Sequence, residues 1–245
     1  GQGLWMDQKG TGRKAAMSKE NFYGSEEGFE SFIRDVKPGY GTGRSPFYIA
    51  IKRVFDLAAS LFGLLLILPL MPFIVILIKL ETPGPILFRQ QRVGYRGRIF
   101  DCYKFRSMAV DAEEQKDRMQ HLNEATGAAF KIKNDPRITG VGRFLRRSSL
   151  DEFPQLFNVF LGDMSIVGPR PQIPSEVADY TPEQARRLLV TPGLTCLWQV
   201  SGRSHLDFSE WMELDQEYVR QAGLGMDLKI LTRTLPAVIE RKGAY

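Results

Sequence analysis

The chain has 245 residues, of which 43% are hydrophobic and 25% are charged, and its formal net charge is +5. This length is enough for one or two domains with a buried core, and the composition excludes wholesale disorder, a collagen-like repeat and a polytopic membrane bundle. Two cysteines and two histidines occur, all far apart, so the sequence offers neither a disulfide framework nor zinc-ligand spacing. We therefore expect a reducing, cytoplasmic setting.

Residues 1–46 differ from the rest of the chain, because they are rich in glycine and lack a sustained apolar period. We expect them to form a flexible N-terminal extension, with at most a short amphipathic piece around Phe29–Val36. No uncharged stretch lies near the start, so these residues do not have the pattern of a signal peptide.

Residues 47–82 contain the segment that is expected to enter a membrane. From Leu57 to Ile78, 22 consecutive residues carry no charge, which is enough for a membrane-spanning helix of about 20 residues. Pro69 and Pro72 interrupt this stretch, and each removes a helical hydrogen bond. The arm before Pro69 would cover only about 18 Å as a helix, whereas the hydrocarbon core of a bilayer is about 30 Å thick.

Basic residues flank both ends of this segment, with Lys52 and Arg53 before it and Lys79 after it. Under the positive-inside rule, both ends favour the cytoplasmic side. A re-entrant helix that enters one leaflet, breaks at a proline and returns satisfies the lengths and the charges together. A single proline-kinked span remains an alternative, because transmembrane helices tolerate proline.

Residues 83–245 are predicted to form one mainly helical domain with a small β-hairpin, so the fold class is mainly α (α+β). The hairpin strands are expected at Ile86–Val93 and Arg98–Lys104, around a turn at Gly94–Gly97. Ser149 and Glu152 have the spacing of a capping box, and Gly162 suits a C-terminal cap. Helices are predicted over Asp111–Ala125, Val141–Arg147, about Asp151–Gly162, Thr181–Val190, Asp207–Ala222 and Asp227–Arg241.

The positive charge is concentrated in two blocks. Lys79–Val110 holds seven bases and two acids, and Lys131–Leu150 holds six bases and one acid. Two basic blocks in an otherwise acidic chain indicate an anionic ligand or an anionic lipid surface. Each block alone is equally compatible with a solvated positive face.

One pair of carboxylates, Asp151 and Glu152, follows the second block at the predicted start of a helix. Alone, the pair fits ordinary acids that complement a helix dipole. Its neighbours favour chemistry, because Arg146 precedes the pair and Arg170 follows it in the Gly168–Pro171 turn. Carboxylates, arginines and a helix N-terminus together suit a diphosphate and a divalent cation.

Other candidate residues have equally ordinary explanations when each is taken alone. Lys104 and Arg106 alternate with aromatics, which also fits a solvated strand face. Arg203 lies in a predicted turn, where it could reach a phosphate or simply face solvent. Asp215 and Tyr218 share one face of a predicted helix, and alone they fit an ordinary surface pair.

Several motifs follow one another along residues 47–245. They are Lys52-Arg53-x-x-Asp56, Tyr103–Met108, Asp135–Thr139, Ser149–Leu156, Gly162–Pro171, Pro192–Thr195, Trp198–Arg203 and Asp215-x-x-Tyr218. Together they resemble the bacterial sugar transferases, which are monotopic polyprenyl-phosphate phosphoglycosyltransferases.

The resemblance implies a monotopic enzyme on the cytoplasmic face of the bacterial inner (cytoplasmic) membrane, held by a re-entrant helix and surface amphipathic helices. Residues 83–245 would be its catalytic domain. It would transfer a sugar-1-phosphate from a UDP-sugar to undecaprenyl phosphate and release UMP. This is the first membrane step of exopolysaccharide, lipopolysaccharide O-antigen or other glycoconjugate assembly. The helix of the family breaks at a proline, which Pro69 matches best, with Pro72 as a rival.

The resemblance also implies roles for the site residues. Asp151 would be the nucleophile that forms a covalent aspartyl–phosphosugar intermediate, and Glu152 would act as a base or an orienting partner. Mg²⁺ or Mn²⁺, bound to Asp151, would neutralise the diphosphate. The positions that match the family's substrate-binding motifs are Lys104, Arg106, Arg146, Arg170, Arg203 and Asp215.

The implied partners are a UDP-sugar, undecaprenyl phosphate, inner-membrane lipid and downstream glycosyltransferases. No nucleic acid is expected, and a homodimer is left open. The sequence of residues 130–152 is similar to that of glucose- or galactose-phosphate transferases, but it does not determine which sugar is transferred. The alternative from another class is a non-catalytic membrane adaptor whose basic faces bind anionic lipid or a partner enzyme.

Overall fold

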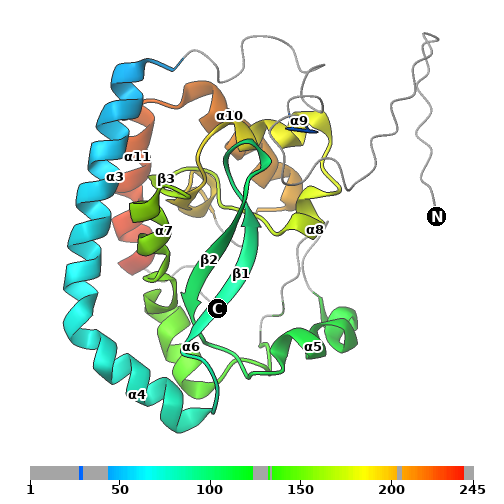
Figure 1. The fold of residues 1–245 in the computed structure, drawn as a ribbon. Coiled ribbons are helices and arrows are strands. Elements are labelled where there is room, and N and C mark those ends of the chain that lie inside the picture. Colours follow the sequence, from blue (N-terminus) through cyan, green and yellow to red (C-terminus); the bar gives the residue numbers. More distant parts are fainter. Residues whose placement is uncertain (1–27, 30–43, 124–131, 133, 203–205, 240–245) are drawn as a thin grey trace, which may run out of the picture.

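The computed structural model describes residues 28–29, 44–123, 132, 134–202 and 206–239 (Figure 1). These residues are mostly helical, as the sequence predicts, and within them the strands form two sheets of two strands each. The α-helices are α3 (Pro46–Ile67), α4 (Met71–Glu81), α5 (Ala112–Lys116), α6 (Gly140–Arg147), α7 (Gln155–Leu161), α8 (Pro174–Val177), α9 (Pro182–Ala185), α10 (Phe208–Gln221) and α11 (Leu224–Ile239). The strands are β1 (Leu87–Val93), β2 (Ile99–Phe105), β3 (Ser165–Val167) and β4 (Gly193–Thr195). The 3-10 helices are η1 (Leu68–Leu70), η2 (Tyr95–Gly97), η3 (Asp117–Leu122), η4 (Leu150–Glu152), η5 (Arg186–Leu189) and η6 (Trp198–Val200).

The apolar segment forms α3 and α4, which are joined by η1. Pro69 lies in η1 and Pro72 lies at the start of α4, so the change of direction visible in Figure 1 falls where prolines remove helical hydrogen bonds. Taken as one unit, Pro46–Glu81 has 36 residues and a mean hydropathy of 2.9. Within the described residues, it is the one helix that is long and apolar enough to cross a membrane.

This helical unit exposes much of its apolar surface. Phe62, Phe73 and Leu80 are 69%, 67% and 80% exposed, and they are three of many such residues along α3 and α4. A contiguous exposed apolar surface marks a site of contact with a membrane or a partner.

The opposite side of α3 is polar and fixed to the rest of the chain. Tyr48 and Lys52 both donate hydrogen bonds to Asp227 Oδ2 of α11, at 2.9 and 2.8 Å. One turn further along, the Ile166 amide of β3 donates to Asp56 Oδ1 at 2.9 Å. Because Tyr48 and Asp56 are buried, these bonds anchor α3 by groups that would be costly to leave unpaired.

The hairpin forms as predicted. β1 and β2 pair antiparallel from Leu87 opposite Phe105 to Val93 opposite Ile99, and the turn contains Gly94. β3 and β4 pair in parallel and were not predicted, since strands of three residues are too short to show a period.

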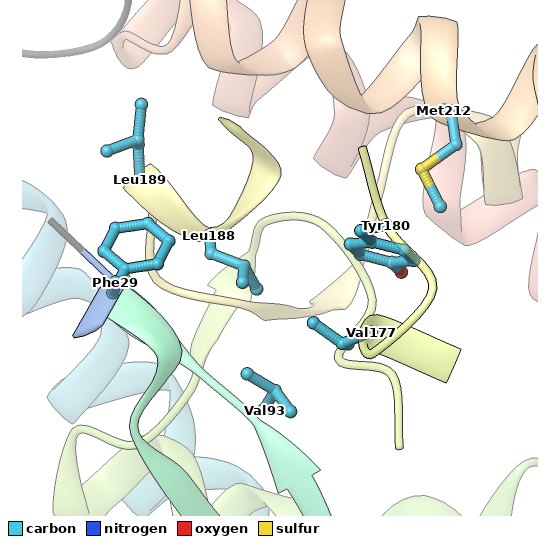
Figure 2. Close-up of a cluster of buried hydrophobic side chains, with 7 residues drawn as sticks. All are labelled: Phe29, Val93, Val177, Tyr180, Leu188, Leu189 and Met212. Atoms are coloured by element: carbon cyan, nitrogen blue, oxygen red, sulfur yellow. The ribbon is translucent and has the colours of Figure 1, made fainter. Parts of the chain in front are cut away.

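A buried apolar cluster lies between the hairpin, α8, η5 and α10 (Figure 2). Phe29, from the expected N-terminal extension, is fully buried in it near Leu188 and Leu189. Residues 1–27 and 30–43 of that extension lie outside the described residues. The cluster fixes the turn end of the hairpin against the helical part of the chain.

Gly142 allows α6 to approach the chain that follows β2. A Cβ at this position would lie 1.9 Å from the Ser107 carbonyl oxygen. We expect Gly142→Ala to lower the free energy of unfolding by about 1–3 kcal/mol, the usual cost of overpacking. Thermal unfolding in detergent measures it. Gly225→Ala is the matched control, because a Cβ there meets nothing within 4 Å. Equal melting temperatures for the two variants would contradict this account.

Candidate functional site

The carboxylate pair lies in η4, the 3-10 turn immediately before α7. The predicted capping box is wrong, since Ser149 is left-handed with φ of 57° and makes no capping hydrogen bond. α7 begins only at Gln155, after Pro154. The physical reason is that the Glu152 side chain is bound by cations from other segments and does not turn back to the Ser149 backbone.

Glu152 accepts hydrogen bonds from two cations on different segments. Lys104 Nζ of β2 donates to Oε1 at 3.0 Å, and Arg170, in the loop after β3, donates to both carboxylate oxygens. Burial opposes the charge of Glu152, but Arg170 and Lys104 outweigh it and hold the pKa of this carboxyl well below its usual range. Glu152 is therefore a carboxylate under physiological conditions.

Asp151 has a different environment. It is buried, with 8% of its surface exposed, and we find no hydrogen bond to its carboxylate from any described residue. Burial and the neighbouring Glu152 charge raise its pKa, against the opposing effect of Lys104, Arg146 and Arg170. Among the described residues, no donor is therefore committed to the Asp151 carboxylate.

A pocket of about 420 Å³ has Lys104 and Arg146 in its wall, whereas Asp151, Glu152 and Arg170 do not line it. The pocket adjoins the pair through Lys104, which binds Glu152, and through Arg146, whose charge acts on Asp151. It is bounded by one face of the hairpin, by the segments that follow β2 and precede α6, by α6 itself and by α8. Its lining residues are Pro85, Leu87, Phe88, Gln90, Arg92, Lys104, Phe105, Arg106, Ser107, Met108, Ala109, Val110, Ala112, Ile132, Asp135, Arg137, Ile138, Arg146, Ile173 and Glu176.

Not every predicted substrate-binding cation is available to a ligand. Arg146 lines the pocket, and its Nε donates to Ser107 Oγ at 2.9 Å, which fixes the direction of the guanidinium. Arg106 is buried and its Nη atoms donate to the Thr82 and Pro83 carbonyls, at 2.7 and 2.6 Å, so it holds the turn after α4. Arg203 lies outside the described residues.

Asp215 does not line the pocket, and the expectation of an ordinary surface pair is wrong because Asp215 and Tyr218 are both buried. Asp215 Oδ2 lies 2.6 Å from Arg187 Nη2. Arg187 in turn donates to the Arg170 carbonyl at 2.7 Å. Asp215 is therefore connected to the site only indirectly, through Arg187 and the backbone of Arg170.

Sequence reasoning missed Arg187. Burial disfavours its charge, but Asp215 and the Tyr180 hydroxyl, which accepts a hydrogen bond from Arg187 Nη1 at 2.6 Å, outweigh this and raise its pKa. In the sequence it is one of two adjacent arginines in a predicted helix, and nothing in the neighbouring sequence distinguishes it from Arg186.

Sequence reasoning also missed Asn158 of α7. Its Nδ2 donates to the Asp101 carbonyl at 2.7 Å, and its Oδ1 accepts from the Tyr103 amide at 3.1 Å. These bonds satisfy the edge of β2 that does not pair with β1, and they fix α7 and the preceding η4 beside Lys104. A polar residue inside the otherwise apolar run Leu156–Leu161 is the signal that could have revealed it.

A divalent cation fits the site in one way. Within the described residues, no group of three or more His, Cys, Asp or Glu side chains could hold a metal. Mg²⁺, however, is commonly bound by one or two carboxylates together with substrate phosphates. Asp151 is the residue of the site whose carboxylate could serve as such a ligand, because no described residue donates a hydrogen bond to it.

Comparisons with known proteins identify the family of the chain. A sequence profile described as bacterial sugar transferase matches residues 47–241. The chain is 45% identical over 199 residues to the galactosyl transferase CpsE of Streptococcus agalactiae, covering 80% of this chain and 44% of that protein. It is 43% identical over 199 residues to the undecaprenyl-phosphate galactose phosphotransferase of Salmonella typhimurium, covering 80% and 42%.

A third relative has a similar size. The exopolysaccharide production protein ExoY of Rhizobium meliloti is 40% identical over 226 residues, covering 86% of this chain and 100% of that protein. In contrast, the chain spans less than half of the length of the Streptococcus and Salmonella relatives.

The ion pair between Asp215 and Arg187 should matter for stability. Asp215→Asn leaves Arg187 buried without its carboxylate, which typically costs about 3–5 kcal/mol. The matched control is Glu183→Gln, because Glu183 pairs with Arg186 at 3.8 Å while 68% of its side chain is exposed. Such a surface pair contributes about 0–1 kcal/mol. Urea unfolding compares the variants, and equal losses would show that the buried pair has no special role.

Proposed function

Because the chain belongs to the bacterial sugar transferase family, we propose that it transfers a sugar-1-phosphate from a UDP-sugar to undecaprenyl phosphate and releases UMP. The observation that carries the proposal is the unpaired, buried carboxylate of Asp151 beside a pocket with cationic walls. The name of the Salmonella relative supports the same lipid acceptor and a phosphosugar as the transferred group.

The proposed reaction has two displacements. Asp151 attacks the phosphorus that carries the sugar, the bond between that phosphorus and the bridging oxygen breaks, and UMP leaves with the oxygen. A phosphate oxygen of undecaprenyl phosphate then attacks the same phosphorus and releases Asp151. The product is a sugar linked to the lipid through a diphosphate.

The contacts of Glu152 favour an orienting role over a basic one. Its pKa is held well below its usual range, and a weak base is a poor proton acceptor. Its carboxylate instead orients Lys104 and Arg170, which lie beside Asp151 and suit the equatorial phosphate oxygens. Mg²⁺ or Mn²⁺ on Asp151 belongs to the same proposal and would supply further charge neutralisation when bound.

The membrane arrangement is also part of the proposal. We propose that α3 and α4 form a re-entrant helix that breaks at Pro69, so that both ends face the cytoplasm at the inner membrane. The exposed apolar side chains of both arms support it, as do the basic residues Arg53 and Lys79 on either side of the uncharged stretch Leu57–Ile78. The lipid-linked product would pass to glycosyltransferases of the same membrane in polysaccharide assembly, and a homodimer is a further proposal.

The covalent step can be tested directly. With a UDP-sugar labelled in the sugar-bearing phosphate, Mg²⁺ and no lipid acceptor, we expect the protein to retain label and release an equal amount of UMP. Asp151→Asn should lose both, because a neutral amide is a far weaker nucleophile. Asp101→Asn is the control, since Asp101 is exposed on β2. Full activity in Asp151→Asn would refute the mechanism, and no UMP release with any donor, with or without undecaprenyl phosphate, would favour the membrane adaptor.

The topology can be tested with single cysteines at exposed positions on either side of the uncharged stretch Leu57–Ile78. Cys102 and Cys196 are buried, so Ala50→Cys and Gln91→Cys provide the reactive thiols. In intact cells, a membrane-impermeant maleimide should label neither position, and in inverted vesicles it should label both. Labelling of the two positions from opposite sides would establish a single span and exclude the re-entrant form.

A further inference from the structure

The pocket near Asp151 has the cations Lys104 and Arg146 near its middle. Its two ends differ in polarity. Lys104 lies opposite Phe88 in the hairpin, and Arg146 faces the same space from α6. From this level the pocket extends in one direction toward α5 and in the other direction along β1 toward α8. Figure 1 shows α5 and α8 on the same side of the hairpin, at different heights along it.

Among the described residues, the end toward α5 is mainly apolar. Met108, Val110 and Ile138 belong to its lining, together with Ala112 and Ile132. Arg137 is also present, but its guanidinium donates to both oxygens of Asp135 and to the Ala112 carbonyl. This end therefore suits a flat ring with little charge.

The end toward α8 is polar. Gln90 and Arg92 alternate along β1, so they project on the same face as Lys104, and Glu176 of α8 lines the pocket opposite them. Arg92 Nη1 donates to the Pro171 carbonyl at 3.0 Å, and Nη2 donates to Gln90 Oε1. Arg92 is thus fixed to the residue that follows Arg170, the partner of Glu152.

We propose that the sugar of the donor lies at the α8 end, where Gln90, Arg92 and Glu176 bind its hydroxyl groups and determine which sugar is accepted. This inference rests on the proposed function. A diphosphate on Lys104 and Arg146 places the nucleoside and the sugar on opposite sides of it, and the apolar end suits the uracil ring. An amide, a guanidinium and a carboxylate supply the donors and acceptors that hydroxyl groups need.

The experiment compares donors within each variant. The rates of UMP release, as kcat/KM, are measured with UDP-glucose, UDP-galactose, UDP-N-acetylglucosamine and UDP-xylose for the unmodified chain, Gln90→Leu and Glu176→Gln. A lost hydrogen bond to a hydroxyl should change at least one ratio of kcat/KM between donors by about tenfold. Inhibition by UMP should stay within about twofold, because UMP has no sugar to lose contact with.

The matched control is Gln91→Leu, the same substitution on the next residue of β1, whose side chain is exposed on the other face of the hairpin. It should leave all donor ratios unchanged. Unchanged donor ratios in both pocket variants would overturn the proposal. If inhibition by UMP were also weaker in these variants, the nucleotide and not the sugar would lie at this end. Glu176→Gln keeps the shape of the side chain, so it decides the question if Gln90→Leu does not fold. An unmodified chain that is inactive with every donor would instead refute the proposed function itself.

Discussion

The carboxylate of Glu152 joins three segments that are far apart in the sequence. It belongs to the turn before α7, and it binds Lys104 on β2 and Arg170 in the loop after β3. Other contacts hold each of these segments in place: Asn158 fixes α7 to β2, and Arg187 fixes the Arg170 backbone. A partly buried ionic cluster of this kind adds little net stability, because desolvation offsets the attraction. What it provides is a defined position for the adjacent Asp151.

The second constraint is that α3 must satisfy two environments at once. Tyr48, Lys52 and Asp56 recur at intervals of four residues and lie on the side that is bonded to α11 and β3. The remaining sides expose apolar groups, which is unfavourable in water and favourable in a lipid layer.

The short helix α7 connects α3 to the segment that carries Glu152. A Cβ on Gly63 of α3 would come within 2.6 Å of the Leu156 side chain of α7, so α3 and α7 are closely packed. Arg53 of α3 donates to the carbonyls of Val159 and Phe160 at the end of α7, both at 2.7 Å. Since α7 directly follows the carboxylate pair, the apolar helix and the site are held together by one element of seven residues.

Local signals allowed much of the fold to be predicted from the sequence. The hairpin has alternating strands around a glycine-containing turn, and α10 begins at Phe208, directly after Asp207, where the helix was predicted to start and which caps it. The interactions that assemble the site have no such signal. Asp215 and Arg187 each look like solvated charges, and only their meeting in the folded chain makes them a buried pair. The capping box at Ser149 failed for the same reason, since distant cations compete for the Glu152 side chain.

The charges of the chain show why a net charge is a poor guide to a binding surface. Several cations that look interchangeable in the sequence are used for internal bonds: Arg53 at the end of α7, Arg106 at the turn after α4, and Arg187 in its buried pair. The cations near Asp151 are few, and Lys104, Arg146 and Arg170 each already have a partner that fixes their direction. The donors that an anion in the pocket would contact are therefore already oriented in the free protein. Binding of the anion does not have to offset the entropic cost of ordering them.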